Sequence, residues 1–287
     1  MNPTRTFNAY HLGDNLIHLN FLRKVALANP DRRFVHYAQW NYLGQLGEVV
    51  VDIPNIELAD FNYMMPADAI DSWRGANGFW YSHPNRNDFV AFHIEWFDKV
   101  ARRMHVENPI KAAEDMLFDY PNILRSLNGA IAIPFDILVI NSPPGSGQFA
   151  SYDQYAVADL ASKLALKGHR IVTTHELPSQ LANVPTTAGK SISVTGIGHL
   201  SLHCHTILMV STGPSWPTFN IWNSGSFSLM SRFSGFDSTF EGYIPHPKPA
   251  PLRVILIDSE RVELTPNSFH CQSIEQAKEL LRQSCLL

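Results

Sequence analysis

The spacing of hydrophobic and polar residues in the N-terminal part of the chain predicts alternating strands and helices. Apolar residues recur at Leu16, Leu19, Leu22 and Ala26, which is the repeat of a helix with one buried face. Short apolar runs before and after this helix are typical of strands. Strands and helices in alternation predict a parallel sheet. The expected strands are residues 6–11, 34–37 and 56–59, and a second helix is expected at 42–50.

Helical spacing replaces the strand signals between Met64 and Pro121. Helices are expected at Ala67–Trp73 and Asn87–His105, separated by an aromatic loop from Gly78 to Pro84. The aromatic side chains either hold a sugar ring or pack a helical layer on the sheet, and packing is the commoner use of such residues. The following stretch, Leu127–Pro134, indicates a hinge.

The order of strand and helix restarts at Phe135, which predicts a second α/β unit. The chain is therefore expected to be an α/β protein with two Rossmann-like domains, and the boundary is expected between Asn128 and Pro134. The expected strands are 135–140, 169–174, 207–210 and 254–257, and the expected helices are 152–167, 198–205 and 273–282, with a Pro- and Gly-rich loop at 235–251.

Composition narrows the class of protein. The chain has 287 residues, of which 45% are hydrophobic and 17% charged, so it has enough material for two folded domains. The net charge of −4 argues against a nucleic-acid partner, because nucleic-acid binders usually display a basic surface. No apolar run approaches the roughly 18 residues of a membrane span, and the N-terminus has no signal-type segment, so we expect a cytoplasmic protein. The three cysteines are expected to be reduced thiols.

Loops after the predicted strands are the candidate sites, because ligands of parallel sheets bind beyond the carboxyl ends of the strands. After the strand at 207–210, Gly213 lets a ligand approach the backbone, and hydroxyl groups lie beside the free N–H groups of a helix start. Such a helix start attracts phosphate. The loop at 141–148 combines glycine and serine in the same way. The residues expected to bind the phosphates of a nucleotide are Ser142, Gly145, Ser146, Gly147, Ser211, Thr212, Gly213, Pro214, Ser215 and Trp216.

Three motifs resemble those of one enzyme family. The run His11–Arg23, followed by Asn29–Asp31 and a strand, is similar to the opening of the lipopolysaccharide heptosyltransferases, glycosyltransferase family 9. In that family a Gly-Asp pair starts the first helix, a Leu-Arg closes its apolar face, and Pro-Asp or Pro-Glu precedes the second strand. The run Val210–Pro214 resembles the family's Asp-Ser/Thr-Gly-Pro-x-His loop, and residues 141–147 lie where the family has a Pro-Gly-containing loop.

The resemblance implies a glycosyltransferase-B fold, with two parallel sheets that face each other across a cleft. The N-terminal domain, 1–132, would hold a saccharide or glycolipid acceptor, and the domain at 133–270 would hold a nucleotide-sugar donor. Residues 271–287 would form a helix that packs back on the N-terminal domain. Asp14 takes the position of the catalytic base, with Gly13 and Asn15 beside it on the acceptor side.

The implied reaction is a sugar transfer, expected to proceed with inversion and without a cofactor. No Asp-x-Asp triplet occurs in the chain, which fits a transferase that uses no metal ion. A peripheral contact with the inner face of the membrane is compatible with a glycolipid acceptor. Ser211 and Trp216 depart from the family's pattern, which has Asp and His at these places. Either the donor contacts are rebuilt or another sugar is used, and Asp14 could also be a plain helix cap.

Other readings of the same motifs remain open. Gly145–Ala150 matches the dinucleotide pattern G-x-G-x-x-A, and Glu176 follows the next strand as a ribose-binding acid would, which is the pattern of an NAD-linked oxidoreductase. Ser215 lies in half of a nucleophile elbow. A sugar- or nucleotide-binding domain without turnover is a further alternative. Three histidines have spacing close to that of metal ligands, although buried or surface histidines are the commoner case: His199, His203 and His205.

Overall fold

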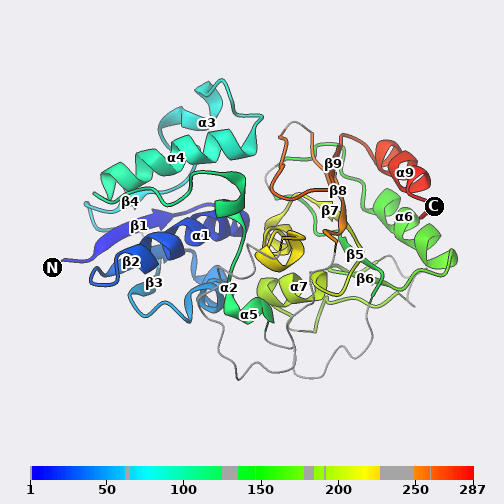
Figure 1. Cartoon of the computed structure of the whole chain (residues 1–287), viewed down its shortest axis with the longest axis horizontal. Helices are drawn as coiled ribbons and strands as arrows, with labels where there is room; N and C mark the ends of the chain where they lie inside the picture. Colours follow the sequence, from blue (N-terminus) through cyan, green and yellow to red (C-terminus); the bar gives the residue numbers. More distant parts are fainter. Residues whose placement is uncertain are drawn as a thin grey trace. The chain divides into compact units, whose positions relative to one another are not determined.

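The computed structural model describes residues 2–61, 65–124, 135–145, 147–177, 184–190, 192–226, 249–258 and 260–287. The chain forms two units, Met1–Tyr120 with Glu260–Leu264 and Pro121–Ser259 with Thr265–Leu287 (Figure 1). The expected boundary at 132/133 lies outside the described residues. The observed boundary, after Tyr120, lies earlier in the chain than the expected one. The reason is that helix α5, Pro121–Leu124, packs on helix α7, Val194–Ser201, of the second unit. At this contact His199 Nδ1 donates to Ile123 O at 2.6 Å.

The first unit has a parallel sheet of four strands in the order β3-β2-β1-β4. Helix α1 follows β1, and its buried residues include Leu16, Leu19 and Leu22. Several polar residues of α1 are buried as well, so the helix is covered on more than the single face that the spacing predicted. The elements are β1 Thr4–Asn8, α1 Leu12–Ala28, β2 Phe34–Ala38, α2 Trp40–Val50, β3 Ile56–Asp60, β4 Ile70–Asp71, α3 Phe79–Ser82 and α4 Phe89–Arg103.

The helix expected at Ala67–Trp73 is absent, and this prediction was wrong. The segment instead forms β4, which pairs with β1 in parallel, and Ser72 N donates to Phe7 O at 2.9 Å. Backbone pairing with the open edge of β1 outweighs the local spacing of apolar residues. The aromatic loop packs as expected, because Phe79 and Trp80 lie against Phe92 of α4 with ring centroids 5.1 and 4.7 Å away.

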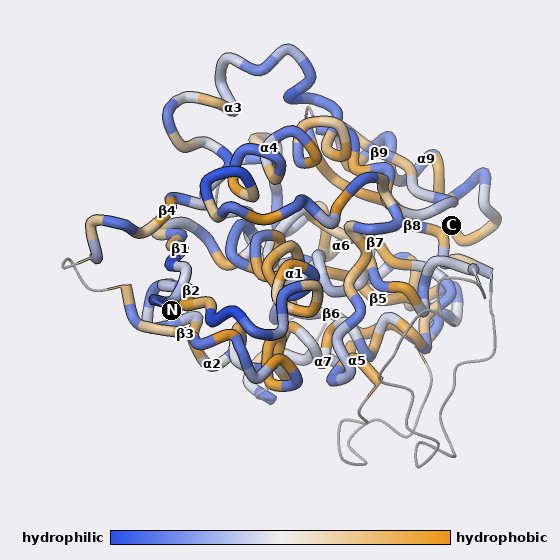
Figure 2. The backbone as a smooth tube through the Cα atoms, turned by 60° about the vertical axis from the view of Figure 1, so that its left-hand side comes forward, coloured by the Kyte–Doolittle hydropathy of each residue, from blue (hydrophilic) through white to orange (hydrophobic). Residues whose placement is uncertain are grey.

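The second unit has a parallel sheet of five strands in the order β6-β5-β7-β8-β9. The apolar strand β5 appears orange in Figure 2, as expected for a strand covered on both faces. Alternate residues of β5, β7 and β8 share a core with helices α6 and α9. The elements are β5 Ile137–Ile140, α6 Gln154–Leu166, β6 Ile171–Thr173, α7, β7 Thr206–Val210, β8 Leu252–Leu256, β9 Ser268–Cys271 and α9 Ile274–Gln283.

The C-terminal helix forms as predicted but packs elsewhere. Ile274, Ala277 and Leu281 of α9 lie in the core of the second unit, whereas the resemblance implied packing on the N-terminal domain. Strand β9, which the spacing did not predict, pairs with β8 and leads directly into α9. The short connection from β9 places the apolar face of α9 on the sheet to which β9 belongs.

Candidate functional site

The order of the strands in the first sheet marks the edge at which parallel sheets usually bind ligands. The chain runs from β1 through β2 to β3 in one direction and then returns to the other side of β1 as β4. Such a reversal opens a crevice at the carboxyl ends of the two strands concerned. Asp14 follows β1, and Arg74 follows β4. The fold therefore brings these two side chains to the same edge of the sheet.

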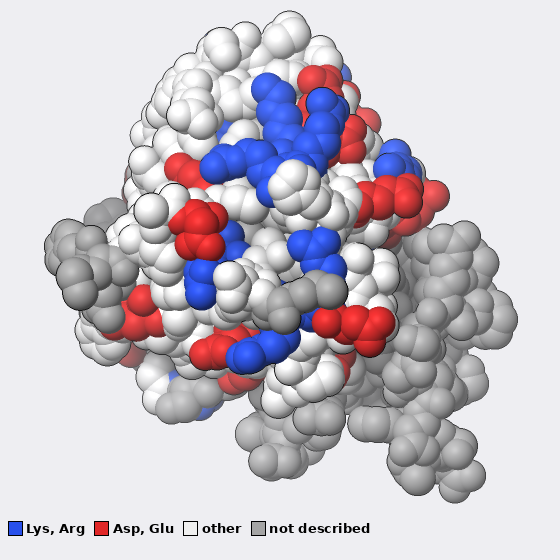
Figure 3. Space-filling model, turned by 90° about the vertical axis from the view of Figure 1, so that its left-hand side faces the viewer, with Lys and Arg blue, Asp and Glu red and all other residues white. Residues whose placement is uncertain are grey.

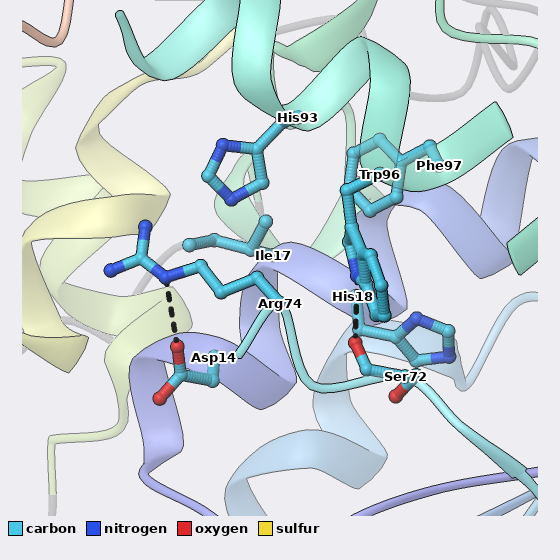
Figure 4. A pocket seen from close by; sticks show the side chains of 8 residues that line it. All are labelled: Asp14, Ile17, His18, Ser72, Arg74, His93, Trp96 and Phe97. Atoms are coloured by element: carbon cyan, nitrogen blue, oxygen red, sulfur yellow. Dashed lines mark hydrogen bonds and ion pairs between the residues drawn. The ribbon is translucent and has the colours of Figure 1, made fainter. Parts of the chain in front are cut away.

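Asp14 and Arg74 form an ion pair at this edge. Arg74 Nε lies 3.6 Å from Asp14 Oδ1, and the two side chains are 12% and 14% exposed (Figure 4). Arg74 Nη1 also donates to Glu260 Oε1 at 2.9 Å, and its guanidinium lies 4.3 Å from the ring centroid of Trp80. Burial raises the pKa of Glu260, an effect that the charge of Arg74 opposes. Arg74 is thus held by a second carboxylate while it faces Asp14.

The carboxylate of Asp14 does not cap its helix. The cap position of α1 is His11, whose side chain makes no capping hydrogen bond, and Asp14 lies inside the first turn. A carboxylate there is stabilised by the positive end of the helix dipole. The alternative reading of Asp14 as a plain helix cap is therefore wrong. Its side chain is directed to Arg74 instead.

The expected neighbours of Asp14 have different surroundings. Gly13 lies in the first turn of α1. Asn15 is fully buried, and its amide Nδ2 donates to His11 O at 3.0 Å. This orientation leaves Asn15 Oδ1 as an acceptor 2.9 Å from His36 Nε2. The protein itself therefore occupies the Asn15 side chain, which differs from the expectation that it faces the acceptor.

A chain of buried hydrogen bonds continues from Asn15. Because His36 Nε2 donates to Asn15, His36 Nδ1 accepts from Thr6 Oγ1 at 3.0 Å, and His18 Nε2 donates to Thr6 Oγ1 at 3.2 Å. Burial lowers the pKa of His36 to about 3 and lowers that of His18 well below its usual value. Both rings are neutral. They hold the start of α1, and with it Asp14, on the sheet.

A small pocket lies beside the ion pair (Figure 4). Its volume of about 10 Å³ is close to the minimum that one water molecule needs. Trp96 Nε1 donates to Ser72 O at 3.1 Å in its wall. The pocket is lined by Asp14, Ile17, His18, Ser72, Arg74, His93, Trp96 and Phe97.

The second sheet has its own reversal of strand order, between β5 and β7. The two loops predicted to bind phosphate follow these two strands, so the fold brings them to one edge. Ser142 lies 3.4 Å from Thr174, measured between the hydroxyl oxygens. Gly147 has a φ of 67°, which favours glycine. Ser146 lies outside the described residues.

The loop after β7 forms a 3-10 helix, η4, at Gly213–Thr218. Thr212 N donates to Ser215 Oγ at 3.3 Å, and Ser215 Oγ donates to Thr212 O at 2.6 Å. Thr218 Oγ1 donates to Ser215 O at 2.7 Å. These hydroxyl groups therefore shape the turn, whereas the sequence predicted that they face a ligand. Ser211 and Trp216 are buried, at 4% and 3% exposed.

A fully buried arginine anchors η4 to the sheet. Arg253 of β8 donates to Thr218 O at 2.7 Å, to Thr218 Oγ1 at 3.1 Å and to Thr265 Oγ1 at 2.8 Å, and it lies 4.7 Å from the ring centroid of Phe219. Burial lowers the pKa of its guanidinium. This role could not be predicted from the spacing of residues, because an isolated arginine in a strand forms no recognisable pattern.

The geometry weakens three alternative readings. Helix α6 begins at Gln154 and is capped by Asp153, so no helix opens within Gly145–Ala150 as a dinucleotide fingerprint requires. Ser215 is 2% exposed and donates its proton to Thr212 O, unlike a nucleophile on an exposed elbow. His203 Nε2 lies 3.4 Å from His199 Nε2. Within the described part of the chain, no group of three or more His, Cys, Asp or Glu is placed to hold a metal ion.

No family model matches the chain, and no curated protein matches it in sequence. Solved structures do resemble it over nearly its whole length. Heptosyltransferase WaaC of E. coli, solved with ADP-2-deoxy-2-fluoro heptose, has 11% identity and a TM-score of 0.56, with 99% of this chain and 100% of that chain covered. ADP-heptose lipopolysaccharide heptosyltransferase II of E. coli has 10% identity and a TM-score of 0.54, with 99% of both chains covered.

A glycosyltransferase family 9 protein of Veillonella parvula has 11% identity and a TM-score of 0.53, with 99% of this chain and 89% of that chain covered. The chain thus has the fold of the heptosyltransferases, with two parallel sheets flanked by helices. The fold that the sequence motifs implied is confirmed. At such low identity the likeness establishes the fold and not the activity.

Proposed function

We propose that the protein is a glycosyltransferase that moves a sugar from a nucleotide-sugar donor to a hydroxyl group of a saccharide or glycolipid acceptor, with inversion and without a metal ion. The observation that carries this proposal is the Asp14–Arg74 pair at the strand reversal of the first sheet. Two structural neighbours support the donor class, since they were solved with ADP and with ADP-2-deoxy-2-fluoro heptose.

Asp14 is the base of the proposed reaction. Its carboxylate accepts the proton of the acceptor hydroxyl while that oxygen forms a bond to the anomeric carbon of the donor. The bond from this carbon to the diphosphate breaks, and the nucleoside diphosphate leaves with the electron pair. Arg74 orients the carboxylate, and Glu260 keeps Arg74 in place.

The donor phosphates are proposed to bind the loops that follow β5 and β7. Gly213 N–H is a donor at the start of η4, and Ser142 and Gly147 lie in the adjacent loop. Because Ser211 and Trp216 are buried, the proposed donor contact does not use these two side chains in place of the family's Asp and His. The proposed donor sugars therefore include a heptose and are not restricted to it.

A glycolipid acceptor would bring the protein to a membrane surface. Within the described part of the chain, no helix is long and apolar enough to cross a bilayer. Lys99, Arg102 and Arg103 are exposed near the end of α4, and Figure 3 shows a group of basic side chains bordered by acidic ones. Basic residues near anionic lipid add about 1 kcal/mol each, which supports a peripheral contact. Sedimentation with phosphatidylglycerol vesicles, compared with phosphatidylcholine vesicles, tests it.

A thermal-shift screen tests the donor class. Nucleoside diphosphates of adenine, uracil, guanine and cytosine are compared with NAD, and a ligand at 100 times its Kd adds about 2.7 kcal/mol to stability. We expect one nucleoside diphosphate to raise the melting temperature, and the matching nucleotide sugars are then tested for transfer. Stabilisation by NAD alone would favour an oxidoreductase. Binding of a nucleotide sugar without any turnover would indicate a binding domain that has lost the activity.

A further inference from the structure

The ring of His93 presents an unused acceptor beside Asp14. His93 Nδ1 lies 2.8 Å from Phe89 O in the preceding turn of α4. A carbonyl oxygen only accepts, so Nδ1 carries the proton. In the neutral ring the second nitrogen, Nε2, then has a free lone pair. Figure 4 shows this nitrogen directed toward Ile17 and Arg74.

His93 is neutral, and the lone pair of its Nε2 accepts no hydrogen bond from the described residues. Burial and then the charge of Arg74 lower the pKa of His93 well below its usual value. The side chain is 1% exposed, and its Nε2 has no hydrogen-bond partner among the described residues. Unpaired buried acceptors are rare in folded proteins because each one is costly. His93 Nε2 is therefore available to accept a hydrogen bond from a group that enters from outside the chain.

The pocket limits what that partner can be. Its volume of about 10 Å³ admits a group the size of one water molecule or one hydroxyl. His18, another residue that lines the pocket, also has a buried nitrogen, Nδ1, without a hydrogen-bond partner among the described residues. A carbonyl or phosphate oxygen has no proton to give to His93 Nε2. The positive charge of Arg74 disfavours an ammonium group, so a hydroxyl group fits best.

We propose that this pocket receives a second hydroxyl group of the acceptor, which donates to His93 Nε2 while the reacting hydroxyl lies at Asp14. This inference rests on the proposed glycosyl transfer and narrows its acceptor to a sugar with two neighbouring hydroxyl groups. His93 is then a residue that determines acceptor specificity. The proton of the second hydroxyl stays on its oxygen, so His93 takes no part in bond breaking.

Nitrogen-15 spectra of the histidine rings test the pocket directly and require no turnover. The probes are the methyl α-pyranosides of mannose, glucose and galactose, and 2-methoxytetrahydropyran is the matched ring without hydroxyl groups. We expect at least one methyl pyranoside, and not 2-methoxytetrahydropyran, to shift the signal of the unprotonated His93 nitrogen. An unchanged signal with all three sugars would mean that the pocket holds only a water molecule. An equal shift with the hydroxyl-free ring would also overturn the proposal.

Two variants separate the ring nitrogens. In His93→Asn the amide can still donate to Phe89 O, as Asn15 and Asn29 do to the carbonyls of the preceding turn at 3.0 and 2.8 Å. This variant has no acceptor at the position of Nε2. In His93→Gln the side-chain carbonyl oxygen restores an acceptor at that position. We expect the KM for the acceptor to rise about tenfold in His93→Asn and to recover in His93→Gln, with an unchanged donor Kd.

The same variants distinguish the failure of this inference from that of the proposed function. The acceptor subsite would be refuted by equal KM values in wild type and His93→Asn. A loss of donor binding in both variants would refute it as well. In either case transfer by the wild type would still support the proposed function. If the wild type transfers no sugar from any donor, the proposed function falls, and the spectra still decide whether the pocket binds a hydroxyl group.

Discussion

Arg74 Nε lies 3.6 Å from Asp14 Oδ1, although the two residues follow different strands of the first sheet. The contact is an ion pair too long for a good hydrogen bond, whereas Arg74 makes a hydrogen bond of 2.9 Å to Glu260. Of these two carboxylates, Glu260 therefore holds Arg74 more tightly. The carboxylate of Asp14 keeps acceptor capacity for a substrate hydroxyl, which is what a general base requires.

Asp14→Asn is expected to keep nucleotide binding and to lower the transfer rate by roughly a hundredfold to ten-thousandfold, the usual contribution of a general base. Donor Kd from calorimetry and kcat from product formation are measured separately. Asp31→Asn, which changes an exposed carboxylate of the same unit, is the control. Normal turnover of Asp14→Asn with a verified donor and acceptor would show that Asp14 is not the base.

Thr212→Val combined with Gly213→Ala is expected to raise the donor Kd about tenfold before it alters kcat. The first change removes the hydroxyl that donates to Val210 O at 3.4 Å, and the second adds a methyl group where the backbone meets the phosphates. Ser284→Ala, at the exposed end of α9, is the control. A donor Kd equal to that of the wild type would place the diphosphate elsewhere.

The buried histidines predict a loss of stability in acid. The pKa of His36 is about 3 in the folded state and 6.5 when unperturbed, so the unfolded chain binds the proton first. Stability contributed by the neutral ring is therefore present above pH 6.5 and falls as the pH drops toward 3, by up to about 1.4 kcal/mol per pH unit for one histidine. The lowered pKa of His18 acts in the same direction.

Urea unfolding between pH 7 and 4 measures this loss. The His36→Gln variant is expected to be less stable at pH 7 and to have a flatter dependence on pH, because it lacks the group that titrates. His175→Gln changes an exposed histidine and is expected to leave the slope unchanged. Equal slopes in wild type and His36→Gln would contradict the assignment.

Leu281→Ala is expected to lower the free energy of unfolding by about 2–5 kcal/mol, the usual cost of a cavity in a core. Leu281 is fully buried in the core that α9 shares with the second sheet. The neighbouring Leu280 is partly buried, so Leu280→Ala is the matched control with a smaller expected loss. Similar values for both variants in chemical unfolding would argue against the observed packing of α9.

Much of the fold follows from local spacing in the sequence. The apolar runs at 137–140 and 206–210 are typical of strands covered on both faces, and they lie in the middle of the second sheet. Strand β4 could not be predicted in this way, because two residues show no periodicity. Its conformation is set by pairing with β1, a partner far away along the chain.

The sequence by itself determined the two α/β units, the loops that follow β5 and β7, and the place of Asp14 at the start of α1. Only the tertiary structure decided the partners of these groups: Arg74 and Glu260 at Asp14, the hydroxyl bonds inside η4, and the tautomer of His93. The physical reason is the distance along the chain over which each kind of interaction acts. Spacing and turn chemistry act over a few residues, whereas ion pairs and buried hydrogen bonds join segments that meet only when the chain has folded.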